Sequence, residues 1–173
     1  MDFDQNSSRA IEHLADRSPA WNAVAIFGAR YLLILFLGVS FFLFWQSGHE
    51  QIALFLFEAL ALGYILAVLL SFAIRRRRPY EVKKDMLHMK PFIYTPSFPS
   101  GHATAAFAAA GVHLAAAYGG QEPWVLAIIA VVVAALVAFG RVMAGVHYVT
   151  DVIGGSILGL LCTGLVGYIA FVV

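Results

Sequence analysis

The fold of this chain is decided by residues 152–173, which read VIGGSILGLLCTGLVGYIAFVV and carry no charged side chain. A helix needs about 20 predominantly apolar residues to cross the hydrocarbon core of a bilayer, and this stretch provides them. Gly155 and Gly159 stand four residues apart within it, a spacing that lets two membrane helices approach closely. The stretch therefore predicts a membrane-spanning helix packed against a neighbouring helix.

Four further apolar runs precede this stretch, separated by turn or charge signals. Of the 173 residues, 61% are hydrophobic and 12% are charged, whereas an ordinary soluble domain has about 25% charged residues. This composition excludes most soluble folds and intrinsic disorder, and the net charge of +1 argues against nucleic-acid binding. The sequence therefore predicts an all-α integral membrane bundle of about five transmembrane helices, in a multi-pass protein of the cell membrane. The four preceding runs are Trp21–Trp45, Ile52–Ile74, Gly101–Tyr118 and Trp124–Met143.

The N-terminal segment, residues 1–19, is too polar to cross the bilayer. In Phe3–Ser18 apolar side chains lie among charged ones, which predicts an amphipathic helix at the membrane interface. Pro19 separates this helix from the first crossing, because proline is favoured in a first helical turn. Acidic residues come before any apolar run, which is the wrong order for a cleavable signal peptide. With no internal repeat or linker, a single domain is predicted over residues 1–173, its bundle formed by residues 20–173.

Five crossings place three polar segments on the same side of the membrane. They are Met1–Ala20, Arg75–Ser100 and Arg141–Asp151. All but one of the 11 lysine and arginine residues lie on or beside this side. Residues 75–102 and 140–151 are therefore predicted to form the loops that carry the chemistry.

Two motifs in these loops are suited to binding and attacking an anion. Residues 97–102 read SFPSGH and lead into an apolar helix, so Ser100 and Gly101 are expected at a helix N-terminus, where free N–H groups favour anions. His147 and Asp151 are four residues apart and would share one face of a helix. The carboxylate would then accept a hydrogen bond from one imidazole nitrogen while the other nitrogen points outward, which prepares the histidine as a nucleophile or base.

These motifs resemble those of the type 2 phosphatidic acid phosphatase family of membrane lipid phosphatases. The family pattern is Lys, six residues, Arg-Pro; then Pro-Ser-Gly-His; then Ser-Arg, five residues, His, three residues, Asp. In this chain the first motif retains Arg78-Pro79, the second is complete at residues 99–102, and the third retains Arg141, His147 and Asp151.

The chain departs from the family pattern at two positions. The serine of the third motif is Gly140, and the lysine of the first motif falls on Ser71. Arg75, Arg76 or Arg77 could supply the missing cation from the same loop. Within the family, the missing lysine, the short N-terminal segment and the small size are most similar to bacterial undecaprenyl diphosphate phosphatases.

The resemblance implies a mechanism without a metal ion or cofactor. His147, oriented by Asp151, would attack phosphorus and form a phosphohistidine. His102 would protonate the leaving oxygen and then activate water. The phosphate-binding residues implied by the resemblance are Arg78, Arg141, Ser100 and Gly101, with help from Arg77.

Arg30 lies within the first apolar run, where an arginine is costly unless it is paired or functional. One interpretation is that it neutralises the second phosphate of a diphosphate lipid, and the other is that it pairs with Glu58 on the next helix. His113 lies deep in the third run, and an interhelical hydrogen bond is the favoured interpretation there.

The leading hypothesis is a membrane enzyme that hydrolyses undecaprenyl diphosphate to undecaprenyl phosphate. The alternatives are a phosphatidate or phosphatidylglycerol phosphate phosphatase with the same site, and a phospholipid headgroup-binding protein without turnover. The expected partners are the lipid substrate and the bilayer, with no nucleic acid, and the oligomeric state is left open. The positive-inside rule places the arginine-rich side in the cytoplasm, whereas the resemblance places it outside. We expect an extracytoplasmic catalytic side, because arginines that bind phosphate are not topology signals.

Overall fold

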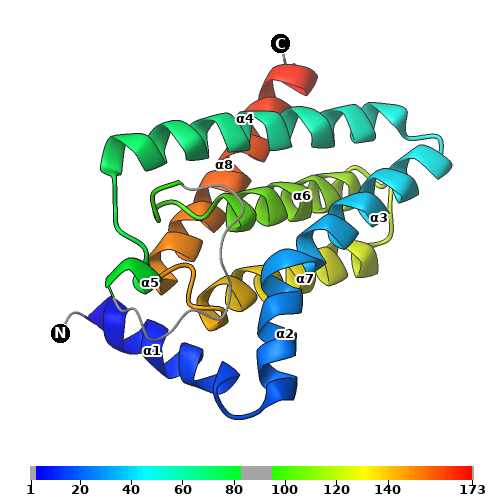
Figure 1. Cartoon of the computed structure of the whole chain (residues 1–173). Coiled ribbons are helices and arrows are strands. Elements are labelled where there is room, and N and C mark those ends of the chain that lie inside the picture. The colour runs from blue at the N-terminus through cyan, green and yellow to red at the C-terminus, as the bar shows by residue number, and fades with distance from the viewer. Residues whose placement is uncertain (1–2, 83–94, 173) are drawn as a thin grey trace.

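The computed structural model describes residues 3–82 and 95–172, and all of its regular structure within these residues is α-helical, as predicted. The chain runs through the helices in the order shown in Figure 1. They are α1 (Phe3–Ala15), α2 (Pro19–Arg30), α3 (Leu32–Gln46), α4 (Glu50–Ile74), α5 (Pro79–Val82), α6 (Gly101–Tyr118), α7 (Trp124–Met143) and α8 (Val149–Val172).

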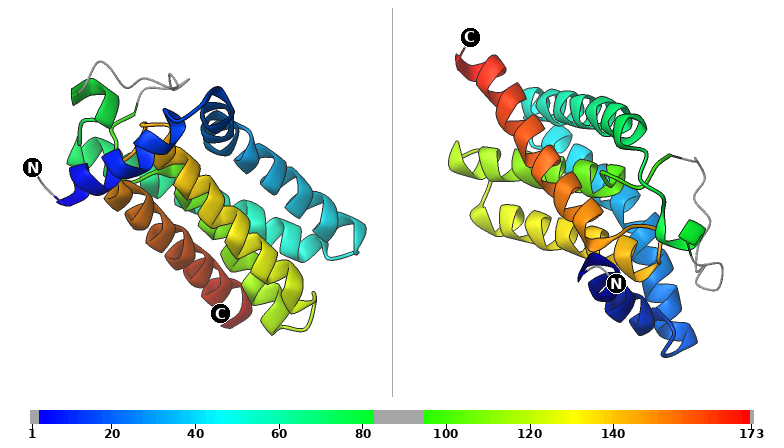
Figure 2. Two further views of the ribbon diagram at one scale, coloured as in Figure 1. Left: turned by 90° about the horizontal axis from the view of Figure 1, so that it is seen from below. Right: turned by 90° about the vertical axis from the view of Figure 1, so that its left-hand side faces the viewer.

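Helix α6 lies at the centre of the bundle and packs against α8, α7, α4 and α3 (Figures 1 and 2). The close packing of α6 on α8 depends on glycine. A Cβ atom on Gly159 would lie 2.3 Å from the carbonyl oxygen of Thr104, and one on Gly155 would lie 2.5 Å from that of Ser100. The packing role predicted for these two glycines is confirmed.

The outer faces of the helices expose large apolar side chains, as expected for a bundle that lies in lipid. Ile34 and Leu161, for example, are 67% and 65% exposed. Three helical segments are long and apolar enough to cross a membrane, and α2 with α3 adds a fourth if the two are counted as one bent span. The three are Glu50–Val82, Trp124–Met143 and Val149–Ala170.

The prediction of about five crossings is therefore met only in part. By composition α6 is not among the candidate spans, because it is rich in alanine and glycine and also carries His102 and His113. A helix surrounded by other helices contacts little lipid, so the usual demand for large apolar side chains does not apply to it.

The first apolar run, predicted as one helix over Trp21–Trp45, is broken at Tyr31, where α2 and α3 meet at a bend of 47°. The Ala29 carbonyl at the end of α2 accepts a hydrogen bond from Arg141 Nη1 at 2.6 Å. A side chain inserted against the backbone ladder is a known cause of such a break. The start of α2 agrees with the prediction, because it begins at Pro19.

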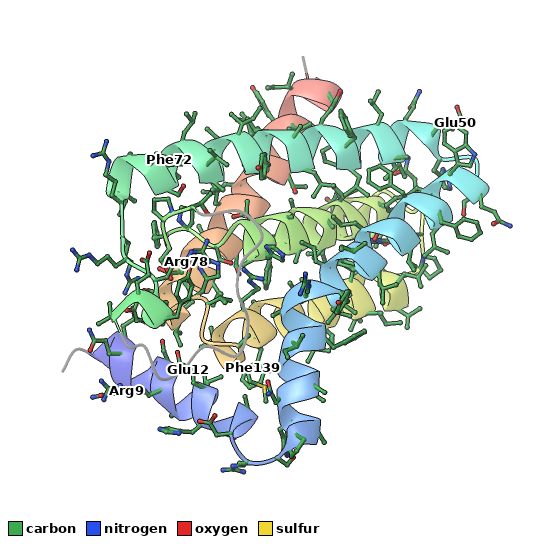
Figure 3. The ribbon with its side chains drawn as sticks, in the orientation of Figure 1. Arg9, Glu12, Glu50, Phe72, Arg78 and Phe139 are labelled. Carbon is green, nitrogen blue, oxygen red and sulfur yellow. The ribbon has the colours of Figure 1, made fainter. Side chains whose placement is uncertain are left out.

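Helix α1 is amphipathic, as predicted, and lies across one end of the bundle against α2, α7 and α8 (Figure 2). Its inner face buries Ser8, Glu12 and Ala15. Figure 3 places Arg9 and Glu12 at the same end of the molecule as Arg78, with Glu50 at the opposite end. Helix α1 and the described parts of the two loops thus gather at one end of the bundle, as predicted.

The interhelical hydrogen bond predicted for His113 is confirmed. Its Nε2 lies 2.9 Å from Ser40 Oγ on α3, and its Nδ1 lies 2.9 Å from a carboxylate oxygen of Glu122, in the loop after α6. The sequence had not indicated Glu122 as its partner. The two contacts of His113 connect α6 with α3 and with the α6–α7 loop, at the end of the bundle far from Arg78.

Candidate active site

A cavity of about 600 Å³ opens between the α2–α3 bend, α4 and the start of α6. One part is lined by basic side chains and the other by apolar and aromatic ones. The basic part contains Arg30, Arg78, His102, Arg141 and His147, and the apolar part contains Leu33, Ile34, Tyr64, Ala67 and Val68.

His147 lies in the turn between α7 and α8 and is 2% exposed. Its Nδ1 lies 2.8 Å from the backbone oxygen of Ser97 and 3.6 Å from Asp151 Oδ2. Both neighbours are acceptors, so Nδ1 carries the hydrogen and donates it to Ser97, which leaves the lone pair on Nε2. Nε2 lies 3.3 Å from Arg78 Nη1 on the cavity side.

The environment of His147 keeps the imidazole neutral at physiological pH. Burial lowers the pKa of His147 to about 4, with a further lowering by the Arg141 and Arg78 charges and an opposing rise from Asp151. A neutral imidazole is the nucleophilic form of histidine, and here its unprotonated Nε2 lies beside Arg78 in a residue that lines the cavity.

Asp151 is fully buried in the first turn of α8. Its Oδ2 accepts hydrogen bonds from the Ser97 hydroxyl and from the Tyr148 backbone N–H, and its Oδ1 accepts one from Arg76 at 2.7 Å. The expectation that His147 and Asp151 share one helix face is wrong, because α8 begins only at Val149. The carboxylate lies beside the imidazole, but the shortest contact of Nδ1 is with the Ser97 carbonyl.

Arg78 is buried and held from three sides. Its Nε and Nη2 donate to the backbone and the hydroxyl oxygen of Thr95, at 2.8 and 2.9 Å, and its Nη1 donates to the Val146 carbonyl at 3.2 Å. Its backbone N–H donates to the Glu81 carboxylate. These contacts fix the guanidinium beside His147 at the cavity wall.

Arg141, at the end of α7, is 4% exposed and also lines the cavity. Its Nη1 donates to the Ala29 carbonyl, while its Nε has no hydrogen-bond partner among the described residues. A buried guanidinium with an unsatisfied donor beside a cavity is suited to bind an anion, because leaving such a donor without an acceptor is costly.

Close packing against α2 explains why position 140 is a glycine and not the serine of the family motif. A Cβ atom there would lie 2.7 Å from the backbone carbon of Gly28 and 2.9 Å from the nitrogen of Ala29. Helix α2 thus occupies the space of any side chain at this position.

The start of α6 brings Gly101 and His102 to the cavity wall. Ser100 is fully buried and caps the helix, because its hydroxyl accepts from the Ala103 N–H at 3.4 Å and its own N–H donates to the Asp151 carbonyl at 2.9 Å. Ser100 thus lies behind the cavity wall that Gly101 and His102 form.

The other arginines predicted as phosphate ligands lie in different environments. Arg30 lines the cavity, with its guanidinium 5.8 Å from the centre of the Tyr31 ring. Arg75 and Arg77 are exposed, and Arg76 is bonded to Asp151. Ser71, at the position of the family lysine, lines the cavity without a charge, and Glu58 is exposed on α4.

Sequence reasoning missed Thr95 and the Ser97 carbonyl as groups that position Arg78 and His147. The only signal was their place in the polar stretch just before the Pro-Ser-Gly-His motif, since backbone acceptors leave no mark in a sequence. Residues 83–94, which make up most of the loop 75–102, lie outside the described residues.

Known proteins resemble this chain in sequence and in fold. Residues 52–172 match the family model of the PAP2 superfamily. Phosphatidylglycerophosphatase B of Bacillus subtilis is 34% identical over 142 residues, which cover 78% of this chain and 64% of that protein. Decaprenylphosphoryl-5-phosphoribose phosphatase of Mycolicibacterium smegmatis is 31% identical over 151 residues, which cover 86% and 69%. The chain thus spans about two thirds of the length of these relatives.

Two crystal structures share the fold. That of Aquifex aeolicus LpxE has a TM-score of 0.74 and 25% identity and covers 96% of this chain and 95% of its own. That of the first transmembrane PAP2 type phosphatidylglycerolphosphate phosphatase from Bacillus subtilis has a TM-score of 0.70 and 28% identity and covers 96% and 84%. Together, the family model over most of the chain, the relatives and the shared multi-pass membrane fold show that this chain belongs to the PAP2 superfamily.

Proposed function

We propose that this protein removes a terminal phosphate from a membrane lipid through a phosphohistidine formed on His147, without a metal ion or cofactor. The observation that carries the proposal is that His147, whose unprotonated Nε2 lies 3.3 Å from Arg78 Nη1, lines the same cavity as two buried guanidiniums, Arg78 and Arg141. Guanidinium forks match the oxygens of a phosphate and stabilise the charge that spreads over them during phosphoryl transfer.

In the first step, the phosphate lies between Arg78, Arg141 and the free N–H groups at the start of α6 near Gly101. His147 Nε2 donates its lone pair to phosphorus as the bond to the leaving oxygen breaks. His102, on the cavity wall, donates a proton to that oxygen, and the dephosphorylated lipid leaves. Ser100 contributes by holding the N-terminus of α6.

In the second step, His102 has lost its proton and accepts one from water. The water oxygen attacks phosphorus, the bond between phosphorus and Nε2 breaks, and inorganic phosphate is released. His147 returns to its neutral form, which its buried environment favours.

The lipid tail would lie in the apolar part of the cavity, between α3 and α4. Leu33 and Ile34 line it from α3, and Tyr64, Ala67 and Val68 line it from α4. The same cavity thus accommodates a charged headgroup at one end and a hydrocarbon chain at the other, and this supports a lipid substrate.

Undecaprenyl diphosphate remains our leading substrate, and phosphatidylglycerol phosphate is the second candidate. The second candidate is favoured by the Bacillus subtilis matches in sequence and in structure, whose names specify that activity. Both lipids carry a second phosphorus group that the reaction leaves in place. Arg30 lines the same cavity as Arg78 and Arg141, and we propose that it binds this retained phosphate.

The proposed function is tested by phosphate release from detergent-purified protein in the presence of EDTA. Undecaprenyl diphosphate, phosphatidylglycerol phosphate and phosphatidate are compared as substrates. We expect turnover that EDTA leaves unchanged, and the preferred lipid identifies the subgroup. If none of the three lipids is hydrolysed while the protein binds them, the headgroup-binding alternative replaces the enzyme.

Replacement of Arg30 with alanine should affect kcat/KM differently for lipids that have one phosphate and for lipids that have two. Loss of a charge-assisted contact should lower kcat/KM for undecaprenyl diphosphate or phosphatidylglycerol phosphate by about tenfold or more, but should change that for phosphatidate little. The control is Arg17→Ala, which removes an exposed arginine outside the cavity. An equal loss on all three lipids would show that Arg30 does not bind the retained phosphate.

We retain the extracytoplasmic orientation of the catalytic side as part of the proposal. Arg76, Arg78 and Arg141 are engaged within or beside the site, so their positive charge has a role other than topology. A reporter fused ahead of α1, a helix at the catalytic end of the bundle, would test the orientation in cells, and a cytoplasmic reporter would contradict it.

A further inference from the structure

The carboxylate of Asp151 is held by groups outside the family motifs. Its Oδ1 accepts a hydrogen bond from Arg76 Nη1 at 2.7 Å, so the fully buried carboxylate has a guanidinium as its counter-charge. A buried carboxylate is stable in its ionised form only when it is paired and hydrogen-bonded. Arg76 is therefore the group that compensates the charge behind His147.

Arg76 is in turn held by the N-terminal helix. Its Nη2 forms an ion pair with Asp4 of α1, its Nη1 also donates to Thr150 Oγ1 at 2.6 Å, and its Cζ lies 4.2 Å from the centre of the Tyr148 ring. The guanidinium thus joins two carboxylates that are 147 positions apart in a chain of 173 residues. These contacts fix the position of the Arg76 guanidinium, whereas an arginine without partners on the surface would be free to move.

Helix α1 also caps the start of α8, on which Asp151 stands. Asp4 Oδ1 accepts from the Thr150 N–H at 3.1 Å, and Ser8 Oγ accepts from the Val149 N–H at 3.0 Å. The Thr150 hydroxyl donates to Asp4 Oδ2 at 2.6 Å. The free N–H groups of a first helical turn are usually capped by a nearby residue, and here α1 supplies both acceptors.

We propose that Asp4 and Arg76 are positioning residues for the catalytic pair, with Asp4 acting from α1. The relay from Asp4 through Arg76 to Asp151 fixes the carboxylate beside His147 and orients the first turn of α8. The inference rests on the proposed phosphatase reaction, because that reaction is its readout. The interfacial position predicted for α1 is compatible with this role but does not require Asp4.

The test measures kcat and KM with phosphatidylglycerol phosphate in detergent micelles, together with inhibition by inorganic phosphate. A positioning role predicts that kcat falls while KM and the inhibition constant for phosphate change little. We expect Arg76→Ala to lower kcat by about 30-fold or more and Asp4→Ala by about tenfold, because small displacements of reacting groups have large effects on rate. Arg76→Lys should recover part of the rate.

Two further variants distinguish positioning from folding. Asp4→Asn removes the charge but keeps an oxygen that accepts from Thr150 N–H, so it should retain thermal stability and still lose kcat. The matched control is Asp16→Ala, just after the end of α1, where the carboxylate lies 3.4 Å from an exposed His13 and outside the relay.

The double variant tests the order of the relay. If the charge of Asp4 acts through Arg76, Asp4→Asn, which keeps an acceptor for the Thr150 N–H, has no additional effect in a protein that already carries Arg76→Ala. Multiplicative effects, or an Asp4→Ala protein as active as Asp16→Ala, would overturn the proposal. A wild-type protein that releases no phosphate from any lipid would instead overturn the proposed function.

Discussion

Replacement of His147 with alanine is expected to reduce phosphate release by about 1,000-fold or more, because the variant lacks the atom that attacks phosphorus. In the wild type, Nδ1 donates to the Ser97 carbonyl and Nε2 holds the lone pair at the cavity. The direct measurement is a rapid-quench experiment with labelled lipid, which should trap an acid-labile, base-stable phosphoprotein in the wild type and none in the variant.

His102→Ala is the informative comparison for this prediction. If His102 is the acid for the leaving oxygen, its loss should slow phosphoprotein formation with a lipid substrate far more than with an aryl phosphate, whose leaving group needs no proton. A phosphoprotein that survives His147→Ala would contradict the assignment of the nucleophile.

The buried environment of His147 predicts the pH dependence of the first step. The pKa of His147 is lowered by burial to about 4, so protonation should remove the nucleophile only as the pH falls through about 4. The rate of phosphoprotein formation that depends on His147 should therefore persist through the range in which an ordinary histidine, of pKa 6.5, becomes charged. An acidic limb centred at 6.5 that disappears with a change at His147 would contradict this expectation.

Replacement of Gly140 with serine restores the residue of the family motif, and yet we expect it to damage this protein. The new Cβ would meet the backbone of Gly28 and Ala29 at 2.7 to 2.9 Å, and backbone atoms cannot rotate away. Overpacking of this kind costs about 1–3 kcal/mol of stability. Displacement of α2 would also move the Ala29 carbonyl away from Arg141 and shift Arg30, so activity should fall about 100-fold.

Thermal unfolding in detergent and phosphate release measure the two effects of Gly140→Ser. Gly140→Ala should be equally harmful, because the Cβ atom and not the hydroxyl causes the collision. Gly38→Ser on α3 is the matched control, since a Cβ atom there meets nothing within 4 Å. A Gly140→Ser protein as active as the wild type would show that α2 yields easily at this contact.

Much of the site was predictable because its chemistry is concentrated in short motifs. Arg78, His102, Arg141 and His147 were identified from the sequence, and the structure brings all four to one cavity. The polar segments were predicted to converge because two crossings separate each one from the next, and an even number of crossings returns the chain to the same side of the membrane. The acceptor for His147 Nδ1 was not predictable, because the direction of the Ser97 carbonyl depends on the conformation of its loop.

Most helix boundaries were predicted closely: α6 and α7 match the predicted ranges at both ends, and α4 matches at its C-terminal end. The apolar runs indicated α4, α7 and α8, since burial in lipid demands apolar side chains along a whole helix. The break at Tyr31 was missed because Arg141, which donates a hydrogen bond to the nearby Ala29 carbonyl, is distant in the sequence. The turn at residues 144–148 lies within the predicted loop 140–151, whereas the shared helix face expected for His147 and Asp151 was wrong because their four-residue spacing also occurs in a turn.

The amino-acid sequence alone was sufficient to predict the membrane character of the chain, its all-helical class and its reactive groups, because hydropathy and motif spacing are local properties. The roles of Gly140, Arg76 and Asp4 emerged only from the tertiary structure. Each depends on a contact between segments far apart in the chain: Gly140 with α2, and Arg76 with Asp4 and Asp151. Such contacts are set by how the helices pack, and packing depends on the shapes of both partners at once, which neither segment encodes separately.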